Sequence, residues 1–139
     1  MERNAMEHAD VSDRRIACVD FNGVLDAYTG WRGAGHFDPP RPGARAFLEA
    51  LASRGYRVVI FTTRWAGDVR RWLHEHALDH LVEDVTDRKP AAHVFVDDRA
   101  VCFRGDFDET LRQIDAFAAH WEAAEGDDRT GHTNAIQSQ

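Results

Sequence analysis

Short apolar runs alternate along this 139-residue chain with stretches in which apolar side chains recur every three or four positions. The periodic stretches predict helices that begin at Pro42, Gly67 and Asp108. The apolar runs predict buried strands at residues 16–21, 57–61 and 93–96, the last a central one, and shorter strands at 81–85 and 101–103. Because strands and helices alternate, the pattern predicts a three-layer α/β fold with a mainly parallel sheet.

Each predicted helix carries its apolar side chains on one side, which we expect to face the sheet. The first helix ends at Gly55, a residue type that commonly terminates helices. The last runs from Asp108 to about Glu125, and the early Asp108 and Glu109 suit the positive end of its dipole. The apolar positions are Phe47, Leu48 and Leu51 in the first helix, Val69, Trp72 and Leu73 in the second, and Leu111, Ile114, Phe117 and Trp121 in the third.

Composition limits the classes of protein to which the chain can belong. Residues 14–125 are expected to form one domain, and the polar residues 1–13 and 126–139 to be disordered. The net charge of −7 argues against bulk non-specific nucleic-acid binding. The apolar runs are too short for a membrane span or a secretory signal, so we expect a cytoplasmic location and no membrane partner. Cys18 and Cys102 fall in predicted strands, where buried, reduced thiols are expected.

Polar side chains follow three of the apolar runs, at the points where strands are expected to end. Asp20 ends the first run, Thr62 follows the second, and Asp97 and Asp98 follow a later one. Lys89 lies between the last two. In open α/β sheets the ligand site lies beyond the carboxyl ends of the strands, so these groups should meet at one edge. Such a set can hold a Mg²⁺ ion and a phosphate.

Cleavage of a phosphate ester needs positive charge and a nucleophile held in line, because the phosphate oxygens repel an attacking group. Asp20 is placed to be that nucleophile and to form an aspartyl phosphate. Lys89 would offset the acidic charge and hold the phosphate. Mg²⁺ prefers oxygen ligands. The groups that can supply them are Asp20, Asp97, Asp98 and the backbone carbonyl near Asn22.

Hydrogen-bond donors complete the expected phosphate site. The Thr62 hydroxyl and the backbone amides from Phe21 to Gly23 would donate to phosphate oxygens. Gly23 also lets the backbone bend where the strand stops. Thr63 and Arg64 come next in the chain and are candidate substrate contacts, although Arg64 would equally form a salt bridge to the aspartates after the later strand.

Taken singly, each of these residues has a simpler explanation. One Asp at a strand end is most often a turn residue, and Lys89 alone would be a surface residue. Asp97 and Asp98 are harder to explain in this way, because adjacent carboxylates at the end of a buried strand repel each other unless a cation neutralises their charge. A receiver-like phospho-acceptor module also combines Asp, Thr and Lys. Its acidic pair lies on the first strand, however, whereas here the pair comes late.

In their order and strand context these residues resemble the haloacid dehalogenase superfamily of aspartate-nucleophile phosphohydrolases. The resemblance covers about residues 15–104. It implies a Rossmann-like fold, Mg²⁺ as the cofactor and Asp20 as the nucleophile. The chain is also similar to small phage and bacterial members of that superfamily. The matching segments are Asp20-Phe21-Asn22-Gly23-Val24 for the first motif, Thr62 for the second, Lys89 for the third and Asp97-Asp98 for the fourth.

One residue departs from that resemblance, because Asn22 stands where phosphatases of the superfamily have a second aspartate. That aspartate protonates the leaving group and then activates water, whereas an amide cannot carry a proton. General acid–base catalysis is worth about 10²–10⁴-fold, so a slow phosphatase is expected. Three interpretations follow. In the first, water, a substrate group or another side chain such as His36 takes over the proton. In the second, the chain forms the aspartyl phosphate or only binds phosphate and does not turn over, as a sensor, partner or phosphotransferase would. In the third, Asn22 is substituted or deamidated.

The superfamily usually carries a cap domain over the site, and this chain leaves no room for one. The gap from Leu25 to Arg41 is only a flap. An open site suits a phosphorylated protein, a nucleotide or a polynucleotide end, unless a second copy of the chain covers it. Trp31, Arg32 and His36 in the flap are candidate substrate contacts. Alternatively, Trp31 and Phe37 hold the flap on the core.

Overall fold

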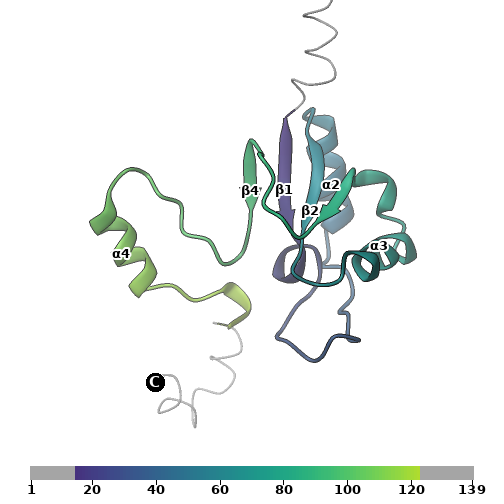
Figure 1. Ribbon diagram of the computed structural model, residues 1–139, viewed down its shortest axis with the longest axis horizontal. Coiled ribbons are helices and arrows are strands. Elements are labelled where there is room, and N and C mark those ends of the chain that lie inside the picture. The colour runs from purple at the N-terminus through teal and green to yellow at the C-terminus, as the bar shows by residue number, and fades with distance from the viewer. Residues whose placement is uncertain (1–14, 123–139) are drawn as a thin grey trace, which may run out of the picture.

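The computed structural model describes residues 15–122, so the end segments expected to be disordered lie outside the described residues. A four-stranded, all-parallel sheet lies at its centre (Figure 1), with the strands in the order β3-β2-β1-β4. This arrangement confirms the predicted fold class, a three-layer-like α/β fold with a Rossmann-like parallel sheet. The strands are β1 (Ile16–Asp20), β2 (Arg57–Phe61), β3 (Asp84–Thr86) and β4 (Val94–Val96).

The two central strands are apolar because their side chains are buried on both faces of the sheet. Ala17 and Val19 of β1 are buried on one face, and Cys18 between them is buried on the other. In register, Ala17 lies beside Val58 of β2 and Val19 beside Ile60. Burial raises the pKa of the Cys18 thiol, as expected for a buried, reduced cysteine.

Two helices, α2 (Ala44–Ser53) and α3 (Ala66–Glu75), cover the face of the sheet that carries Val19. Gly55 ends α2 as predicted, with a φ of 88° that glycine adopts freely. The prediction that Phe47 faces the sheet is wrong. This residue is 37% exposed, at a position just off the buried side of α2. The helix side chains buried in this core are Ala44, Leu48 and Leu51 of α2 and Val69, Trp72 and Leu73 of α3.

The second half of the chain departs from the prediction at three points. A short 3-10 helix, η2 (Asp79–Leu81), comes first, so β3 starts only at Asp84. β4 pairs with β1 alone and is an edge strand of the described sheet rather than a central one. Residues 101–103 form no strand, because the backbone leaves the sheet after β4 and has no neighbouring strand to pair with. Cys102 in this segment is therefore exposed rather than buried.

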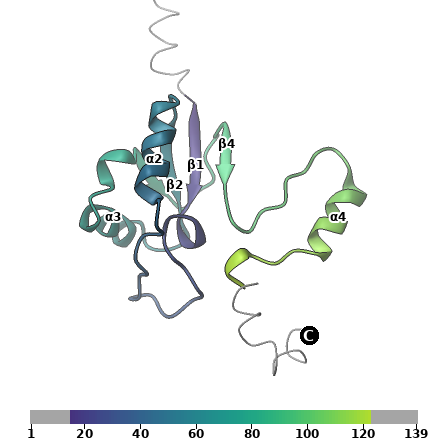
Figure 2. The same ribbon diagram turned by 180° about the vertical axis from the view of Figure 1, so that it is seen from behind.

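The last helix with defined bounds, α4 (Phe107–Asp115), stands apart from the sheet (Figure 2). Asp106 caps it, since its carboxylate accepts hydrogen bonds from the N–H groups of Asp108 and Glu109. The predicted continuous helix is wrong, because α4 ends at Asp115 and a separate helical turn begins at His120. Its apolar side chains were predicted to face the sheet, and they are exposed instead. Among residues 15–122, none of the helices combines the length and apolar character needed to cross a membrane.

Replacing Leu48 with alanine is expected to lower the free energy of unfolding by about 2–5 kcal/mol, because its side chain is fully buried between α2 and the sheet. Phe47→Ala, at the preceding position, removes a partly exposed ring and should cost at most about 1 kcal/mol. Urea unfolding followed by circular dichroism measures both losses. Equal losses in the two variants would show that α2 packs on the sheet through a different side.

Candidate functional site

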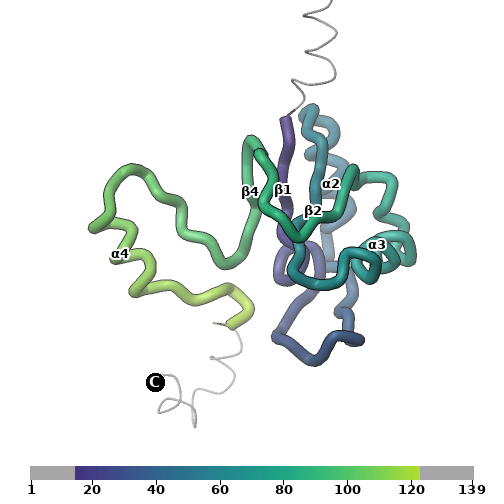
Figure 3. Tube along the Cα trace, viewed as in Figure 1, coloured from purple at the N-terminus to yellow at the C-terminus, as the bar shows by residue number. Residues whose placement is uncertain are grey.

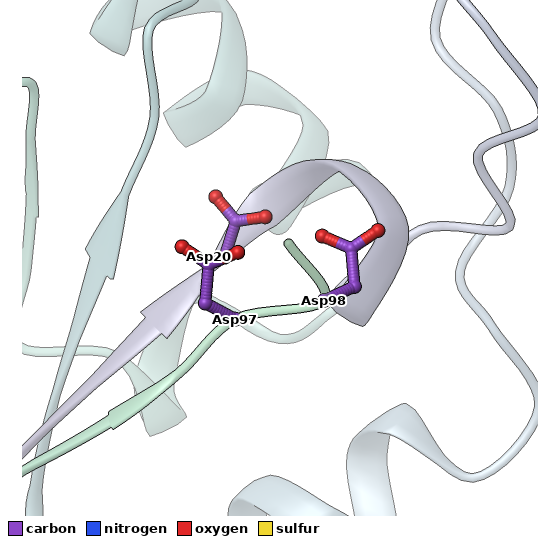
Figure 4. Close-up of side chains that lie close together, drawn as sticks. All are labelled: Asp20, Asp97 and Asp98. Atoms are coloured by element: carbon purple, nitrogen blue, oxygen red, sulfur yellow. The ribbon is translucent and has the colours of Figure 1, made fainter. Parts of the chain in front are cut away.

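Three aspartates meet at the carboxyl edge of the sheet (Figure 4). Asp20 is the last residue of β1, and Asp97 and Asp98 follow β4 directly. β1 and β4 are parallel neighbours with Val19 beside Val96, so both strands deliver their next residues to the same edge. One carboxylate oxygen from each aspartate lies within 4.8 Å of the other two. The fold therefore brings together the three carboxylates that the sequence assigned to a metal site.

A tight turn after β1, η1 (Phe21–Leu25), shapes the backbone beside Asp20. The Phe21 side chain is buried in the core, where its ring meets Trp72 edge-on at 4.9 Å. Gly23 has a φ of 91°, and a Cβ at this position would collide with the Asp98 carboxylate. Glycine is thus required here both for the turn and for the close approach of Asp98.

Asn22 is held by a buried carboxylate that the sequence analysis did not single out. Its side-chain amide donates a hydrogen bond of 2.6 Å to Asp26 Oδ2, and the Gly23 N–H donates one of 2.9 Å to Asp26 Oδ1. Asp26 is fully buried, which raises the pKa of its carboxyl group, while these two hydrogen bonds lower it. Asp26 is a single aspartate after Val24-Leu25 and belongs to no sequence pattern, so the sequence could not identify it as part of the site. The amide at position 22 is therefore built into the turn.

Asp98 is the most enclosed of the three aspartates, with 4% of its side chain exposed. Trp121 Nε1 donates a hydrogen bond of 2.5 Å to its Oδ2 atom. Its Oδ1 atom is buried and has no hydrogen-bond partner in the part of the chain that the structure describes. An ionised oxygen without a partner is costly to bury, so either a cation or a proton shared with Asp20 would stabilise this atom.

Crowding changes the protonation of Asp20. Burial, as the largest cause, and the nearby charges of Asp97 and Asp98 together raise the pKa of its carboxyl group to about 7. The Phe21 N–H opposes this effect by favouring the ionised form. Near neutral pH the three carboxylates can therefore all be ionised at low cost only when a cation joins them.

The donor set fits a hard divalent cation such as Mg²⁺. All three side chains offer carboxylate oxygens, the ligands that Mg²⁺ prefers, and the unpartnered Asp98 Oδ1 supplies an oxygen that no described donor satisfies. Asp97 is the exposed member, and its Oδ1 accepts a hydrogen bond of 2.8 Å from the Arg99 N–H. The backbone carbonyl near Asn22 remains a predicted ligand.

A pocket of about 320 Å³ opens beside Asp20. Thr62 lies in its wall, nearly fully buried, and its hydroxyl accepts a hydrogen bond of 2.9 Å from the Arg64 N–H. That hydroxyl keeps its own proton free to donate toward the pocket. The residues that line the pocket are Asp20, Asn22, Tyr28, Thr62, Thr63, Asp97, Arg99 and Trp121.

Lys89 lies near the aspartates without pairing with them. Its Nζ atom sits 4.9 Å from the centre of the Phe95 ring, and it forms no ion pair with any acidic group among residues 15–122. It lines a second hollow, which Asp20 and Asp97 also border. Lys89 does not line the pocket beside Asp20, and its role in holding phosphate remains a prediction.

The flap is organised by Arg64. The guanidinium of Arg64 donates hydrogen bonds to the backbone carbonyls of Gly33, Ala34 and His36, and it lies over the rings of Phe37 and Trp31 at 3.7 and 5.1 Å. These contacts favour the interpretation that Phe37, which packs against the core, holds the flap in place, whereas Trp31 is 63% exposed. Arg64 makes no salt bridge to the site aspartates within the described chain.

The other flap candidates point elsewhere. Arg32 donates a hydrogen bond to the Thr29 hydroxyl, and His36 Nε2 lies 3.0 Å from Asp38 Oδ1. Neither residue lines the pocket beside Asp20, and Trp31 does not line it either. The structure therefore does not bring these three predicted substrate contacts into the site.

A segment near the end of the described chain closes one side of the pocket instead. Trp121 meets the Tyr28 ring edge-on at 5.0 Å, and the Arg99 guanidinium lies 5.5 Å from the centre of the Trp121 ring. His120 Nε2 lies 3.0 Å from the Gly23 carbonyl oxygen. The sequence placed Trp121 in the apolar stripe of a helix, so its return to the site had no sequence signal.

Comparison with known proteins supports the fold alone. No family model and no curated protein matches the chain. A solved structure of a conserved protein from Bacteroides thetaiotaomicron is similar, with a TM-score of 0.51 and 18% sequence identity over 78% of this chain and 96% of that one. This chain thus shares a parallel α/β architecture with that protein.

Mg²⁺ is expected to raise the melting temperature, and to do so more in alkaline than in acidic solution. Without a cation, the raised pKa of Asp20 means that its carboxyl group holds a proton more tightly in the folded chain than in the unfolded chain. That contribution to stability is present below about pH 4 and is lost as the pH rises through about 7. Because protons and Mg²⁺ compete for the same oxygens, about 10 mM Mg²⁺ should add about 2–5 °C at about pH 8 and less at about pH 5.5.

Scanning calorimetry measures this increase, and two variants control it. Asp98→Asn should lose the increase, whereas Glu49→Gln, which changes an exposed carboxylate on α2, should keep it. An increase of equal size at both pH values, or one that persists in Asp98→Asn, would place the cation elsewhere.

Proposed function

We propose that this chain is a Mg²⁺-dependent phosphoric-ester hydrolase of the haloacid dehalogenase type, which acts through an aspartyl phosphate on Asp20. The observation that carries the proposal is the meeting of Asp20 with Asp97 and Asp98, whose buried oxygen has no donor among the described residues. Such a carboxylate group can hold a cation and direct one of its members at phosphorus. The order of the four motifs along the chain supports the same proposal.

The reaction would proceed by two displacements at phosphorus. An oxygen of the ionised Asp20 carboxylate forms a bond to phosphorus as the ester oxygen leaves with the bonding electron pair and takes up a proton. Water then attacks the same phosphorus and loses a proton as the bond between phosphorus and the Asp20 oxygen breaks, which releases inorganic phosphate and restores the Asp20 carboxylate. When bound, Mg²⁺ would supply the positive charge that keeps the aspartates ionised and offsets the charge on the phosphate oxygens.

Hydrogen-bond donors around Asp20 would hold the phosphate during both steps. Thr62 lines the same pocket, and its hydroxyl is free to donate because it accepts rather than donates in its bond with Arg64. The Gly23 N–H, predicted to donate to phosphate, is instead engaged by Asp26, and the Phe21 N–H hydrogen-bonds the Asp20 carboxylate. Donors fixed in advance stabilise the charge of a transition state without the cost of reorganising during the reaction.

The proton steps are the weak point of the site. Asn22 cannot exchange a proton, and its amide is already engaged by Asp26. His36 pairs with Asp38 in the flap and does not line the pocket, so solvent water or the substrate itself would carry the proton. Loss of general acid–base catalysis lowers the rate of hydrolysis by about 10²–10⁴-fold, so the enzyme would be slow.

The rim of the pocket indicates the substrate class. Tyr28 and Trp121 offer aromatic surface, and Arg99 offers a cation beside the aspartates. Aromatic rings and a guanidinium favour phosphomonoesters that carry a nucleobase or a second anionic group. The pocket has no separate cap domain among residues 15–122, so the substrate can extend beyond it.

A second candidate function is a phosphate-binding or phosphotransfer protein of the same fold. The hydrogen bond between Asn22 and the buried Asp26 favours it, because this contact makes the amide part of the folded turn. Such a protein would bind Mg²⁺ and phosphate with little or no turnover.

Exchanging two side chains, Asn22→Asp together with Asp26→Asn, is expected to raise the turnover number by about 10²–10⁴-fold. The exchange keeps one amide and one carboxyl group in contact but places the carboxyl group at the pocket. Asn22→Asp alone sets two carboxyl groups together where donor and acceptor now lie 2.6 Å apart, so it should lose about 1–3 kcal/mol of stability that the exchange restores. Phosphate release from p-nitrophenyl phosphate and nucleoside monophosphates measures turnover, and urea unfolding measures stability.

Asp20→Asn should abolish turnover in both the original and the exchanged chain, whereas Glu49→Gln should leave it unchanged. Turnover that persists in Asp20→Asn would overturn the assignment of the nucleophile. If neither the original nor the exchanged chain turns over while Mg²⁺ still raises the melting temperature, the binding function is the correct one.

A further inference from the structure

Trp121 joins the aspartates from a segment that lies far from them along the chain. The backbone leaves the sheet beyond Asp98, runs out through α4 and returns at Trp121 (Figure 3). There the indole Nε1–H donates its hydrogen bond of 2.5 Å to Asp98 Oδ2. Trp121 also lines the pocket beside Asp20, so the indole belongs to the site itself and not only to its surroundings.

This hydrogen bond gives the two oxygens of the Asp98 carboxylate different tasks. Oδ2 is held by the indole, whereas Oδ1 is buried and has no hydrogen-bond partner among residues 15–122. The carboxylates of Asp20, Asp97 and Asp98 point to the same side of the sheet edge (Figure 4). A donor that holds one oxygen of a ligating carboxylate fixes the orientation of the other. Oδ1 of Asp98 is therefore the oxygen that remains for a cation.

The Asp98 side chain has little freedom to turn away from this orientation. It is 4% exposed, and Gly23 lies so close that a Cβ at the glycine would collide with the carboxylate. The backbone of Gly23 thus limits the carboxylate on one side while the indole holds it at Oδ2. Together they leave a rigid ligand, which binds a cation better than a mobile one.

The indole is in turn fixed by its own neighbours. Its ring meets the Tyr28 ring edge-on at 5.0 Å, and the Arg99 guanidinium lies 5.5 Å from the ring centre. The two preceding residues are anchored as well, since His120 Nε2 lies 3.0 Å from the Gly23 carbonyl oxygen and Ala119 is buried. A donor that packing already holds loses little entropy when it orients a ligand, so the indole is in place before a cation arrives.

Packing of the ring and donation by its N–H are separate contributions. The contacts with Tyr28 and Arg99 use the edge and the face of the ring and do not require the nitrogen. A ring that only closed the pocket would need no donor directed at a buried carboxylate. A donor to an ionised oxygen forms a charge-assisted hydrogen bond, which is about twice as strong as a neutral one. The N–H therefore acts on Asp98 rather than on the shape of the pocket.

We propose that Trp121 is a positioning residue of the cation site, whose indole N–H holds Asp98 Oδ2 so that Oδ1 is presented to Mg²⁺. This role rests on the metal site of the proposed function but not on phosphoryl transfer at Asp20. Coupling between two binding events is reciprocal, so bound Mg²⁺ also strengthens the contact between Asp98 and the indole. The cation thereby fastens the returning segment to the sheet edge.

Calorimetric titration of the full chain with MgCl₂ tests this role. Replacing Trp121 with benzothienylalanine keeps the fused ring and exchanges the N–H for sulfur, so the Kd for Mg²⁺ should rise about 10–100-fold. Trp121→Phe should raise it at least as much. Trp65→Phe, which changes an exposed tryptophan outside the pocket beside Asp20, should leave the Kd unchanged. Circular dichroism verifies that each variant is folded at the titration temperature. A merely structural contact would lower the melting temperature and leave the Kd of the folded chain unchanged.

The indole proton gives a second readout that needs no activity. In a nitrogen–proton correlation spectrum, the indole signal that Trp121→Phe removes should shift as Mg²⁺ saturates the site, and the signal that Trp65→Phe removes should not. An unchanged Kd in the benzothienylalanine variant, or a Trp121 signal that stays fixed at saturation, would overturn the role of the N–H.

Failure of this role can be told apart from failure of the proposed hydrolase. Mg²⁺ binding that depends on the Trp121 N–H, without any phosphate release, would uphold the positioning role and overturn only the hydrolase. An unchanged chain that binds no Mg²⁺ would overturn both.

Discussion

Electrostatic repulsion among Asp20, Asp97 and Asp98 is the constraint around which the site is organised. Two neighbouring parallel strands end at the same edge and place three carboxylates within 4.8 Å of one another. The neighbouring residues reflect this crowding. Gly23 has no side chain where Asp98 approaches, Trp121 donates to one Asp98 oxygen, and the pKa of Asp20 rises to about 7. A divalent cation relieves all three charges at once, which no described side chain does.

The sequence predicted the first half of the chain closely because each element there is specified by its own residues. β1 is an apolar run that ends in Asp20, β2 is one that Thr62 follows, and α2 and α3 begin within two residues of their expected starts. The aspartates could be found for the same reason, since strand ends in a parallel sheet determine which residues meet. Thr62 and Thr63 joined them in the pocket, as the order of the strands indicated.

What the sequence could not predict depends on contacts between distant segments. The helical stripe of α4 was clear, but periodicity does not specify which surface a helix packs on, and this helix stands away from the sheet. The return of Trp121 to the aspartates and the contact between Asn22 and Asp26 are single side-chain interactions without a repeating pattern. The flap aromatics were candidate substrate contacts because they lie in a loop beside the expected phosphate site, and the sequence does not show that Arg64 contacts them instead.

The nucleophilic role of Asp20 is tested most directly by fluorine NMR of the chain mixed with beryllium fluoride, which bonds to a carboxylate oxygen and imitates a phosphoryl group. If Asp20 accepts phosphoryl groups beside a Mg²⁺ site, bound fluorine resonances should appear only when Mg²⁺ is present and should vanish in Asp20→Asn. Bound resonances that persist in Asp20→Asn, or their absence from the unchanged chain with Mg²⁺, would contradict this role.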